Sequence, residues 1–104
     1  MRRRYLAIRV ESEGSVNRGE VTDAIWKAVG QLFGEYGASQ LGMVMIEYDE
    51  QRSHGVVRCS HKTLPMLKAS IASITKINGK STAIRVLRVS GTLKALHKKY
   101  RFRQ

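Results

Sequence analysis

The sequence predicts an α+β fold in which a four-stranded antiparallel sheet carries two helices on one face and is followed by a short basic helix. Apolar residues alternate in four short segments and recur at helical spacing in two longer ones, and these segments occur in the order βαββαβ. With right-handed crossovers, one sheet with both helices on the same side is the most economical arrangement. We expect one domain over 1–104, with 1–3 and 101–104 as flexible tails.

The first strand and the first helix are expected before residue 37. From Tyr5 to Val10 every second residue is a large aliphatic one, as a half-buried strand requires. Asn17 stands three residues before Glu20, the spacing at which these side chains cap a helix N-terminus. Gly37 can end the helix in the left-handed conformation, which predicts a helix over 18–36. Its buried face would comprise Val21, Ala24, Ile25, Ala28, Val29, Leu32, Phe33 and Tyr36.

The second and third strands are expected to form a hairpin. Apolar residues occupy four successive positions from Met43 to Ile46, and the pattern continues to Asp49, so both faces of the second strand should be covered. A polar connection over 49–54 leads to a short third strand from Gly55 to Ser60.

A second helix and a fourth strand follow. Pro65 suits a first helical turn, because its missing N–H would be unpaired there in any case. The helix is expected to run to about Ile77, where Asn78 and Gly79 stop it. The segment 82–89 is rich in β-branched residues and predicts the fourth strand.

Charge is divided unevenly along the chain. Residues 1–50 carry 6 Lys or Arg and 8 Asp or Glu, a net of −2, whereas residues 51–104 carry 13 basic and no acidic residues, a net of +13; together they give +11. Such an imbalance repels itself unless a polyanion, commonly nucleic acid or an anionic membrane, neutralises it. No stretch approaches the roughly 20 apolar residues that span a bilayer, which favours nucleic acid and excludes a membrane partner.

The cytoplasm is the expected location. Cys59 is the single cysteine and cannot form an internal disulfide, so a reducing compartment suits the chain. The charged start from Arg2 to Arg4 is followed by no apolar signal core.

Basic residues in three places are candidates for contact with RNA. A helix is expected from Leu93 to about Tyr100. One stripe, at i, i+3, i+4 and i+7, consists of Lys94, His97, Lys98 and Arg101, and the adjoining stripe that can dock the helix consists of Leu93, Leu96 and Tyr100. The other two places with basic residues are a flexible N-terminal arm and the arginines within the predicted strands. The candidates are Arg2, Arg3, Arg4, Arg58, Arg85, Arg88, Lys94, His97, Lys98, Lys99 and Arg101. A solvated surface is the plainer interpretation, but the absence of acids after position 50 favours RNA.

The predicted topology invites comparison with the RNA recognition motif, whose central strands stack bases on aromatic rings. The third strand of this chain, His54 to Cys59, contains no aromatic residue, and in the first strand only Tyr5 can stack a base. We therefore expect contacts with phosphate, sugar and RNA shape more than sequence-specific reading of bases.

No catalytic or metal site is predicted. The His, Cys, Asp and Glu residues between positions 47 and 61 match no metal-ligand spacing, and a hairpin of mixed charge accounts for them more simply. The sequence contains no nucleophile elbow, phosphate-binding loop or general acid pair. The chain is therefore expected to have no active site of its own and to bind no cofactor.

A protein-facing surface is expected in the acidic first half. Trp26 falls at the margin of the apolar stripe of the first helix, where a large aromatic residue is either half-buried core or an anchor for a partner. The second strand adds Met43, Met45 and Tyr48 as candidates for the same interface. One half of the chain would then contact protein and the other RNA.

Four short motifs resemble those of a known family. They are Arg4-Tyr5-Leu6 in the first strand, Leu32-Phe33-Gly34 in the first helix, Gly55-Val56-Val57-Arg58-Cys59 in the third strand and Ser90-Gly91-Thr92-Leu93 before the basic helix. On these motifs, and over nearly its whole length, the chain resembles the archaeal and eukaryotic ribonuclease P protein component 2 family.

The resemblance implies an RRM-like or ferredoxin-like fold and a non-catalytic subunit of a ribonucleoprotein endonuclease. In such a complex the ribonuclease P RNA, with magnesium in its own active site, would hydrolyse precursor tRNA to remove the 5′ leader, and this chain would support the RNA. The implied protein partner is the TIM-barrel-like component 3, in a heterodimer or a heterotetramer. RNA contact is carried over to Arg4, Arg85, Arg88 and residues 94–99.

Two other functions fit parts of the pattern. A ribosomal-protein-like RNA-binding module would have a similar composition. A ferredoxin-like domain that binds a small regulatory molecule would have the same order of elements, but it would not need a C-terminal half with a net charge of +13. The dependence of RNA affinity on salt separates the regulatory domain from the other two, because phosphate contacts release counterions.

Overall fold

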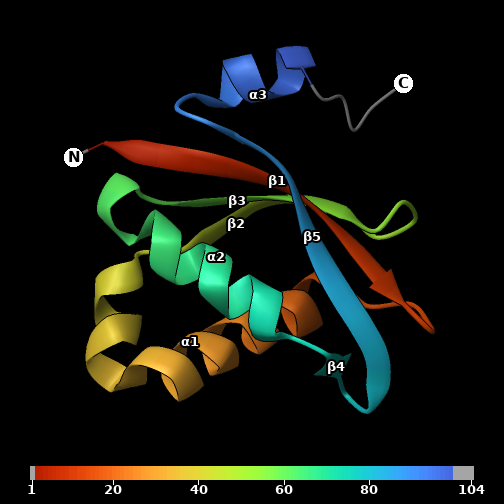
Figure 1. Ribbon diagram of the computed structural model, residues 1–104. Helices are drawn as coiled ribbons and strands as arrows, with labels where there is room; N and C mark the ends of the chain where they lie inside the picture. Colours follow the sequence, from red (N-terminus) through yellow and green to blue (C-terminus); the bar gives the residue numbers. More distant parts are fainter. Residues whose placement is uncertain (1, 100–104) are drawn as a thin grey trace.

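The computed structural model describes residues 2–99 of the chain, with side chains up to residue 97. Its elements are β1 (Arg3–Ser12), α1 (Arg18–Leu41), β2 (Val44–Asp49), β3 (His54–Ser60), the 3-10 turn η1 (His61–Thr63), α2 (Leu64–Ser73), β4 (Lys76–Ile77), β5 (Lys80–Ser90) and α3 (Leu93–Lys99). They form three layers, with α1 and α2 on one face of the sheet and α3 on the other (Figure 1). Within residues 2–99, no helix is long and apolar enough to cross a membrane.

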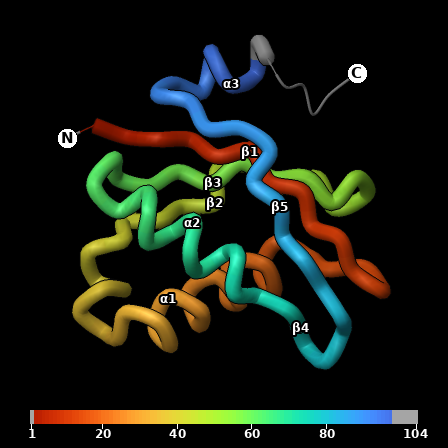
Figure 2. The backbone as a smooth tube through the Cα atoms, viewed as in Figure 1, coloured from red at the N-terminus to blue at the C-terminus, as the bar shows by residue number. Residues whose placement is uncertain are grey.

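The sheet has five antiparallel strands in the order β2-β3-β1-β5-β4, so β1 lies between β3 and β5 (Figure 2). The prediction of four strands was wrong, because Lys76 and Ile77, expected at the end of the second helix, form β4 and pair with the start of β5. Asn78 and Gly79 make the turn between them with φ values of 51° and 79°. An Asn-Gly pair favours a two-residue hairpin turn, so here it joins two strands, and α2 already ends at Ser73.

The main core lies between the sheet and the helices α1 and α2. The aliphatic side of β1 faces this core through Leu6, Ile8 and Val10, which confirms the predicted alternation. Buried residues of both helices cover it, namely Val21, Ile25 and Val29 from α1 and Leu67 and Ile71 from α2. Burial of one large aliphatic side chain stabilises the fold by about 1.5–3 kcal/mol, so this layer is the main source of stability.

Helix α1 begins where the sequence predicted and ends later. The side chain of Asn17 accepts from the N–H of Glu20 at 2.9 Å, and the Glu20 carboxylate accepts from the N–H of Asn17 at 2.9 Å, so the predicted capping box is confirmed. Gly37 was expected to end the helix, but it is buried, and a Cβ there would lie 2.4 Å from the Cβ of Phe33. The helix instead bends at Gly34, where φ is 72°, and ends at Leu41.

The C-terminal part of α1 presents an apolar surface to solvent. Leu32, Phe33 and Tyr36 are 50%, 41% and 77% exposed, although the sequence predicted that they belong to the core. The bend at Gly34 explains the exposure of Tyr36, because the residues after it no longer continue the buried stripe of the first turns. Leu32 and Phe33 precede the bend and lie outside the buried face of Val21, Ile25 and Val29. We call Leu32, Phe33 and Tyr36 the apolar patch.

A second, smaller core lies on the opposite face of the sheet, beneath α3. Leu96 is buried there against Ala7 of β1 and Val56 of β3. Partly buried neighbours complete the cluster: Tyr5, Ile46, Leu87 and Leu93. Strand β2 therefore packs on both sides, as predicted, with Met45 in the main core and Ile46 in the smaller one. The expected docking of the basic helix by its leucines is confirmed for Leu93 and Leu96.

The capping box makes folding stability depend on pH in the acidic range. Hydrogen bonds from the Asn17 N–H and, secondly, from the Asn78 side chain hold the pKa of Glu20 below its ordinary value of 4.5. Ionised Glu20 therefore stabilises the folded state. This contribution is complete above pH 4.5 and is lost as the pH falls through the lowered pKa of Glu20 in the folded state. We expect Glu20→Gln to flatten the fall in unfolding free energy between about pH 5 and pH 3, measured by urea denaturation. A variant as steep as the wild type would contradict this.

Candidate nucleic-acid interface

The fold separates the charges to the two ends of the sheet. In the strand register, Arg3 of β1 lies opposite Ser60 of β3, and Tyr5 lies opposite Ser90 of β5. The start of β1 is therefore adjacent to the ends of β3 and β5, and we call this the basic end. Five arginines lie there, four of them on strands and one just before β1: Arg3, Arg4, Arg58, Arg88 and Arg2.

At the other end, acidic side chains neutralise part of the basic charge. Five of the eight acidic residues gather there, on β1 and its following loop, the start of α1 and the β2–β3 turn: Glu11, Glu13, Glu20, Asp49 and Glu50. Glu11 accepts from Arg85 at 2.9 Å and from Arg9 at 2.9 Å. The hydrogen bond from Arg85, together with that from Arg9, holds the pKa of Glu11 below its ordinary value. Arg85, an RNA-contact candidate, is thus already paired and lies away from the basic end.

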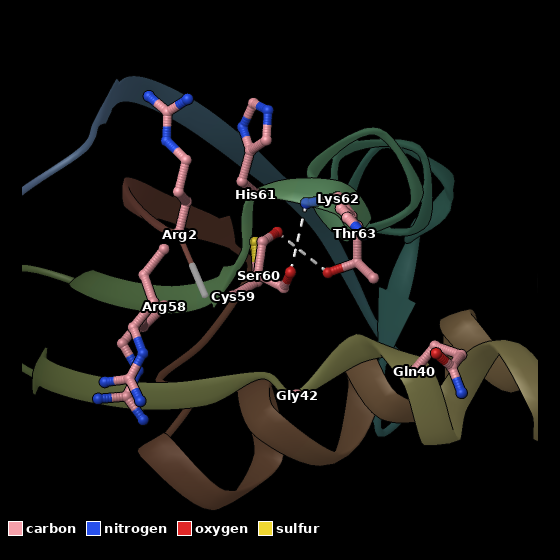
Figure 3. Close-up of a pocket in the computed structure, with 10 residues that line it drawn as sticks. Arg2, Gln40, Gly42, Arg58, Cys59, Ser60, His61, Lys62 and Thr63 are labelled. Atoms are coloured by element: carbon pink, nitrogen blue, oxygen red, sulfur yellow. Dashed lines mark hydrogen bonds between the residues drawn. The ribbon is translucent and has the colours of Figure 1, made fainter.

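A cleft of about 560 Å³ opens at the basic end (Figure 3). Ten residues from β1, the end of α1, β3 and η1 line it: Arg2, Arg3, Gln40, Gly42, Arg58, Cys59, Ser60, His61, Lys62 and Thr63. None of the ten is acidic, and four are Arg or Lys. Among the described residues, no carboxylate pairs with any of these four side chains. We call this cavity the basic cleft.

Backbone hydrogen bonds fix the walls of the basic cleft. The N–H of His61 donates to the carbonyl of Arg2 at 2.8 Å, which holds the start of the chain beside η1. The Thr63 hydroxyl bonds to the carbonyls of Leu41 and Ser60, each at 3.1 Å, and so ties the end of α1 to the end of β3. The expectation of a flexible arm at Arg2 to Arg4 was therefore wrong, because β1 begins at Arg3 and strand pairing orders it.

The floor of the cleft is neutral. Cys59 is buried, and burial raises the pKa of its thiol, so the thiol stays protonated near neutral pH. Gly42, at the C-cap of α1, has φ 59°, a conformation that favours glycine. The cleft thus combines a cationic rim with an uncharged base.

Three residues of the cleft were missed as RNA-contact candidates: Gln40, His61 and Lys62. His61 was considered only among metal ligands, and Gln40 was expected to lie beyond the first helix. Lys62 follows the third strand by two residues, and only the pairing of β1 with β3 places it beside Arg2 and Arg3. The sequence feature that could have selected Lys62 is its position after residue 50, in the half of the chain without acidic residues.

Helix α3 presents part of the predicted basic stripe. Lys94 is exposed, whereas His97 turns toward the sheet, with its Nε2 atom 3.2 Å from the Glu47 carboxylate of β2. The two residues were expected to face RNA together, but His97 lies beside Glu47 and only Lys94 is exposed. Lys98 and Lys99 belong to α3, but their side chains, like all of Arg101, lie outside the described residues.

The two remaining strand arginines lie on opposite faces of the sheet, because Arg4 pairs with Cys59 of the main core and Arg88 with Ala7 of the smaller one. Arg88 is exposed and lies opposite Ala7, on the face of the sheet that α3 covers. Arg4 is half-buried, and its guanidinium donates to the carbonyl of Arg3 at 3.0 Å. Tyr5, the one aromatic residue predicted to be able to stack a base, is part of the small core under α3. Base stacking on the open sheet, as in the RNA recognition motif, is therefore blocked in this conformation.

The candidates for a protein interface are placed mainly in the core. Met43 and Met45 are buried beneath the helices, and half-buried Trp26 packs against the same core. The Tyr48 hydroxyl donates to the carbonyl of Val16 at 2.8 Å. Among the side chains that the structure describes, the large apolar ones that are exposed are instead Val44 and the apolar patch.

No metal cluster is present in the described part of the chain, where no three His, Cys, Asp or Glu side chains are grouped suitably. The acidic residues of the β2–β3 region have structural roles. Asp49 accepts from the N–H groups of Gln51 and Arg52 in the turn, and Glu47 faces His97.

Comparison with known proteins decides the family. Residues 4–101 match the Rpp14/Pop5 family. The chain belongs to that family. It is 35% identical to ribonuclease P protein component 2 of Pyrococcus furiosus over 99 residues, which cover 95% of this chain and 82% of that protein. The component of the same name from Methanosarcina barkeri is 31% identical over 95% of this chain and 72% of its own length.

These matches confirm that the chain is a ribonuclease P protein component 2, a subunit of a ribonucleoprotein endoribonuclease. A chain in the cryo-EM structure of yeast ribonuclease MRP shares the fold, with a TM-score of 0.74 over 88% of this chain and 75% of that one, at 13% identity. The overall fold of this chain is thus shared with that structural neighbour.

Proposed function

We propose that the basic end binds the ribonuclease P RNA along its phosphate backbone and so supports RNA-catalysed removal of the 5′ leader from precursor tRNA. The observation that carries this proposal is the basic cleft, whose rim holds four Arg or Lys residues and no carboxylate. Exposed Arg88 and Lys94 extend the same cationic surface toward α3. Catalytic magnesium belongs in this proposal to the RNA, and the setting is the cytoplasm.

The apolar patch is the surface proposed for the protein partner, the TIM-barrel-like component 3. Leu32, Phe33 and Tyr36 are large, exposed and lie within five residues of one another in the sequence. Aromatic residues are enriched at the centre of protein interfaces. Trp26 lies seven residues before Phe33, on the same helical stripe, and extends the patch at its half-buried edge. None of the three patch residues lines the basic cleft, so in this proposal a heterodimer or heterotetramer can form while RNA is bound.

Loss of the apolar patch should weaken this pairing. We expect Phe33→Ser together with Tyr36→Ser to raise the Kd for component 3 by about 30-fold or more, because a single aromatic anchor commonly contributes about 2 kcal/mol. Both side chains are exposed, so the fold should persist in circular dichroism. Trp26→Ala is the comparison: an anchor would weaken pairing to a similar extent, whereas a core residue would lower thermal stability instead. Unchanged pairing in the double variant would remove the patch from the interface.

Reconstitution tests the whole proposal. The chain and component 3, added to the cognate RNA at limiting magnesium, should stimulate cleavage of precursor tRNA. No stimulation would favour an RNA-binding module of another assembly. A flat dependence of RNA affinity on salt would favour a small-molecule regulatory domain, because each phosphate contact should contribute about −0.7 to −0.9 to the slope of log affinity against log salt.

A further inference from the structure

The shape of the basic cleft is unlike a surface for paired RNA. A duplex presents its phosphates on a convex exterior, and side chains on an open surface are sufficient to contact them. The basic cleft is a cavity of about 560 Å³. Cavities that hold small molecules measure roughly 300–1,000 Å³, so its volume suits a group of nucleotide size. A nucleotide can enter such a cavity only where it is unpaired and displaced from the stack.

The two sides of the cleft differ in chemistry. Figure 3 shows Arg2 and Arg58 on one side and Gln40 on the other, with Ser60 and Thr63 between them. Guanidinium groups bind phosphate through several N–H donors, and their planar faces can also stack on a base. The cationic side therefore suits the phosphate of a nucleotide, and the opposite side suits the base.

Gln40 has the properties of a group that reads a base edge. Its side chain is exposed at the end of α1 and makes no hydrogen bond within the described residues. An amide offers donors and an acceptor together, as the edge of a base requires. The Thr63 hydroxyl is less suited to this role, because it already donates to backbone carbonyls on α1 and β3.

We propose that the basic cleft binds a single unpaired nucleotide of RNA, with its phosphate against Arg2 and Arg58 and its base toward Gln40. This inference rests on the proposed function, since it names the RNA feature that the basic end would recognise. It also assigns the chain a preference for RNA structure that its phosphate contacts alone would not produce.

Two RNA hairpins that differ by one nucleotide test the proposal with the full chain. One hairpin is fully paired in its stem, and the other carries a single extra unpaired adenosine. Fluorescence anisotropy should show roughly tenfold tighter binding to the second, the size expected from one captured base. Equal, salt-dependent affinity for both hairpins would overturn this inference and leave RNA binding intact. Binding to neither at low salt would overturn the proposed function as well.

A variant and a crosslink locate the preference. Gln40→Leu keeps the side-chain size and charge and should reduce the tenfold preference to less than about twofold, the result for a lost pair of base-edge hydrogen bonds. Gln31→Leu, on the exposed surface of the same helix, is the matched control and should retain the preference. A 4-thiouridine at the unpaired position carries its reactive sulfur on the base and should therefore crosslink to the peptide that contains Gln40. Crosslinks confined to α3, or an undiminished preference in Gln40→Leu, would overturn the proposal.

Discussion

Replacement of Arg3, Arg58 and Lys62 together by glutamine is expected to weaken binding to the cognate ribonuclease P RNA by about 100- to 500-fold at about 0.1 M salt. Counterion release gives each phosphate contact a slope of about 0.7–0.9 in log affinity against log salt, so three contacts supply that factor at about 0.1 M. The slope itself should become shallower by about 2–3. Filter binding at a series of salt concentrations measures both quantities.

A control triple variant separates position from net charge. Lys27, Lys68 and Lys76 are exposed on the helical side of the molecule, and their replacement by glutamine changes the formal charge from +11 to +8, as the first triple variant does. We expect this control to lose far less affinity, because its lysines lie away from the basic cleft. Equal losses in the two variants would mean that net charge, and not the basic end, governs RNA binding.

Leu96→Asp is expected to release α3 from the sheet. Leu96 is fully buried against Ala7 and Val56, and a seven-residue helix has little stability without such contacts. Loss of a buried leucine generally destabilises the folded state by about 2–5 kcal/mol. Because α3 can detach from the sheet by itself, we expect the docked state of α3 to lose about 2–3 kcal/mol. The population of detached α3 should then rise roughly 25- to 150-fold. Amide hydrogen exchange should become fast in α3 while the core strands remain protected.

The same variant distinguishes two ways of binding RNA. If the basic end and α3 form one surface, release of α3 misplaces Lys94 and RNA affinity should fall. If the sheet beneath α3 were the true RNA site, its exposure would raise the affinity instead. Lys94→Ala, which leaves the small core intact, is the control for the charge alone. A rise in affinity in Leu96→Asp would contradict the interface described above.

Much of the fold followed from local patterns in the sequence. The alternation in β1, the capping box of α1 and the docking leucines of α3 were all confirmed, because each depends on residues close together in the chain. The wrong predictions concern residues whose type is compatible with two different local structures. Gly37 was taken for a helix end but is needed for close packing, and Asn78-Gly79 was taken for a helix stop but forms a hairpin turn.

The sequence predicted which types of residue form the candidate site, but it did not predict which of them lie together. The absence of acids after position 50 indicated a cationic surface, and Arg2, Arg3 and Arg58 were all selected as candidates. The sequence offered no reason to group these three with Lys62 and Gln40, which come from different elements. It also gave no sign that Arg85 would be bonded to Glu11, 74 residues away in the chain.

The sequence by itself determined the class of fold, the family and the polycationic character of the second half, because alternation, spacing and charge are all properties of neighbouring residues. Only the tertiary structure decided which cations share a surface. Antiparallel pairing of β1 with β3 and β5 brings the first residues of the chain beside residues 58–63 and 88–90, and sends most acidic residues to the far end of the sheet. That separation depends on strand register, which residues far apart in sequence fix together through the core.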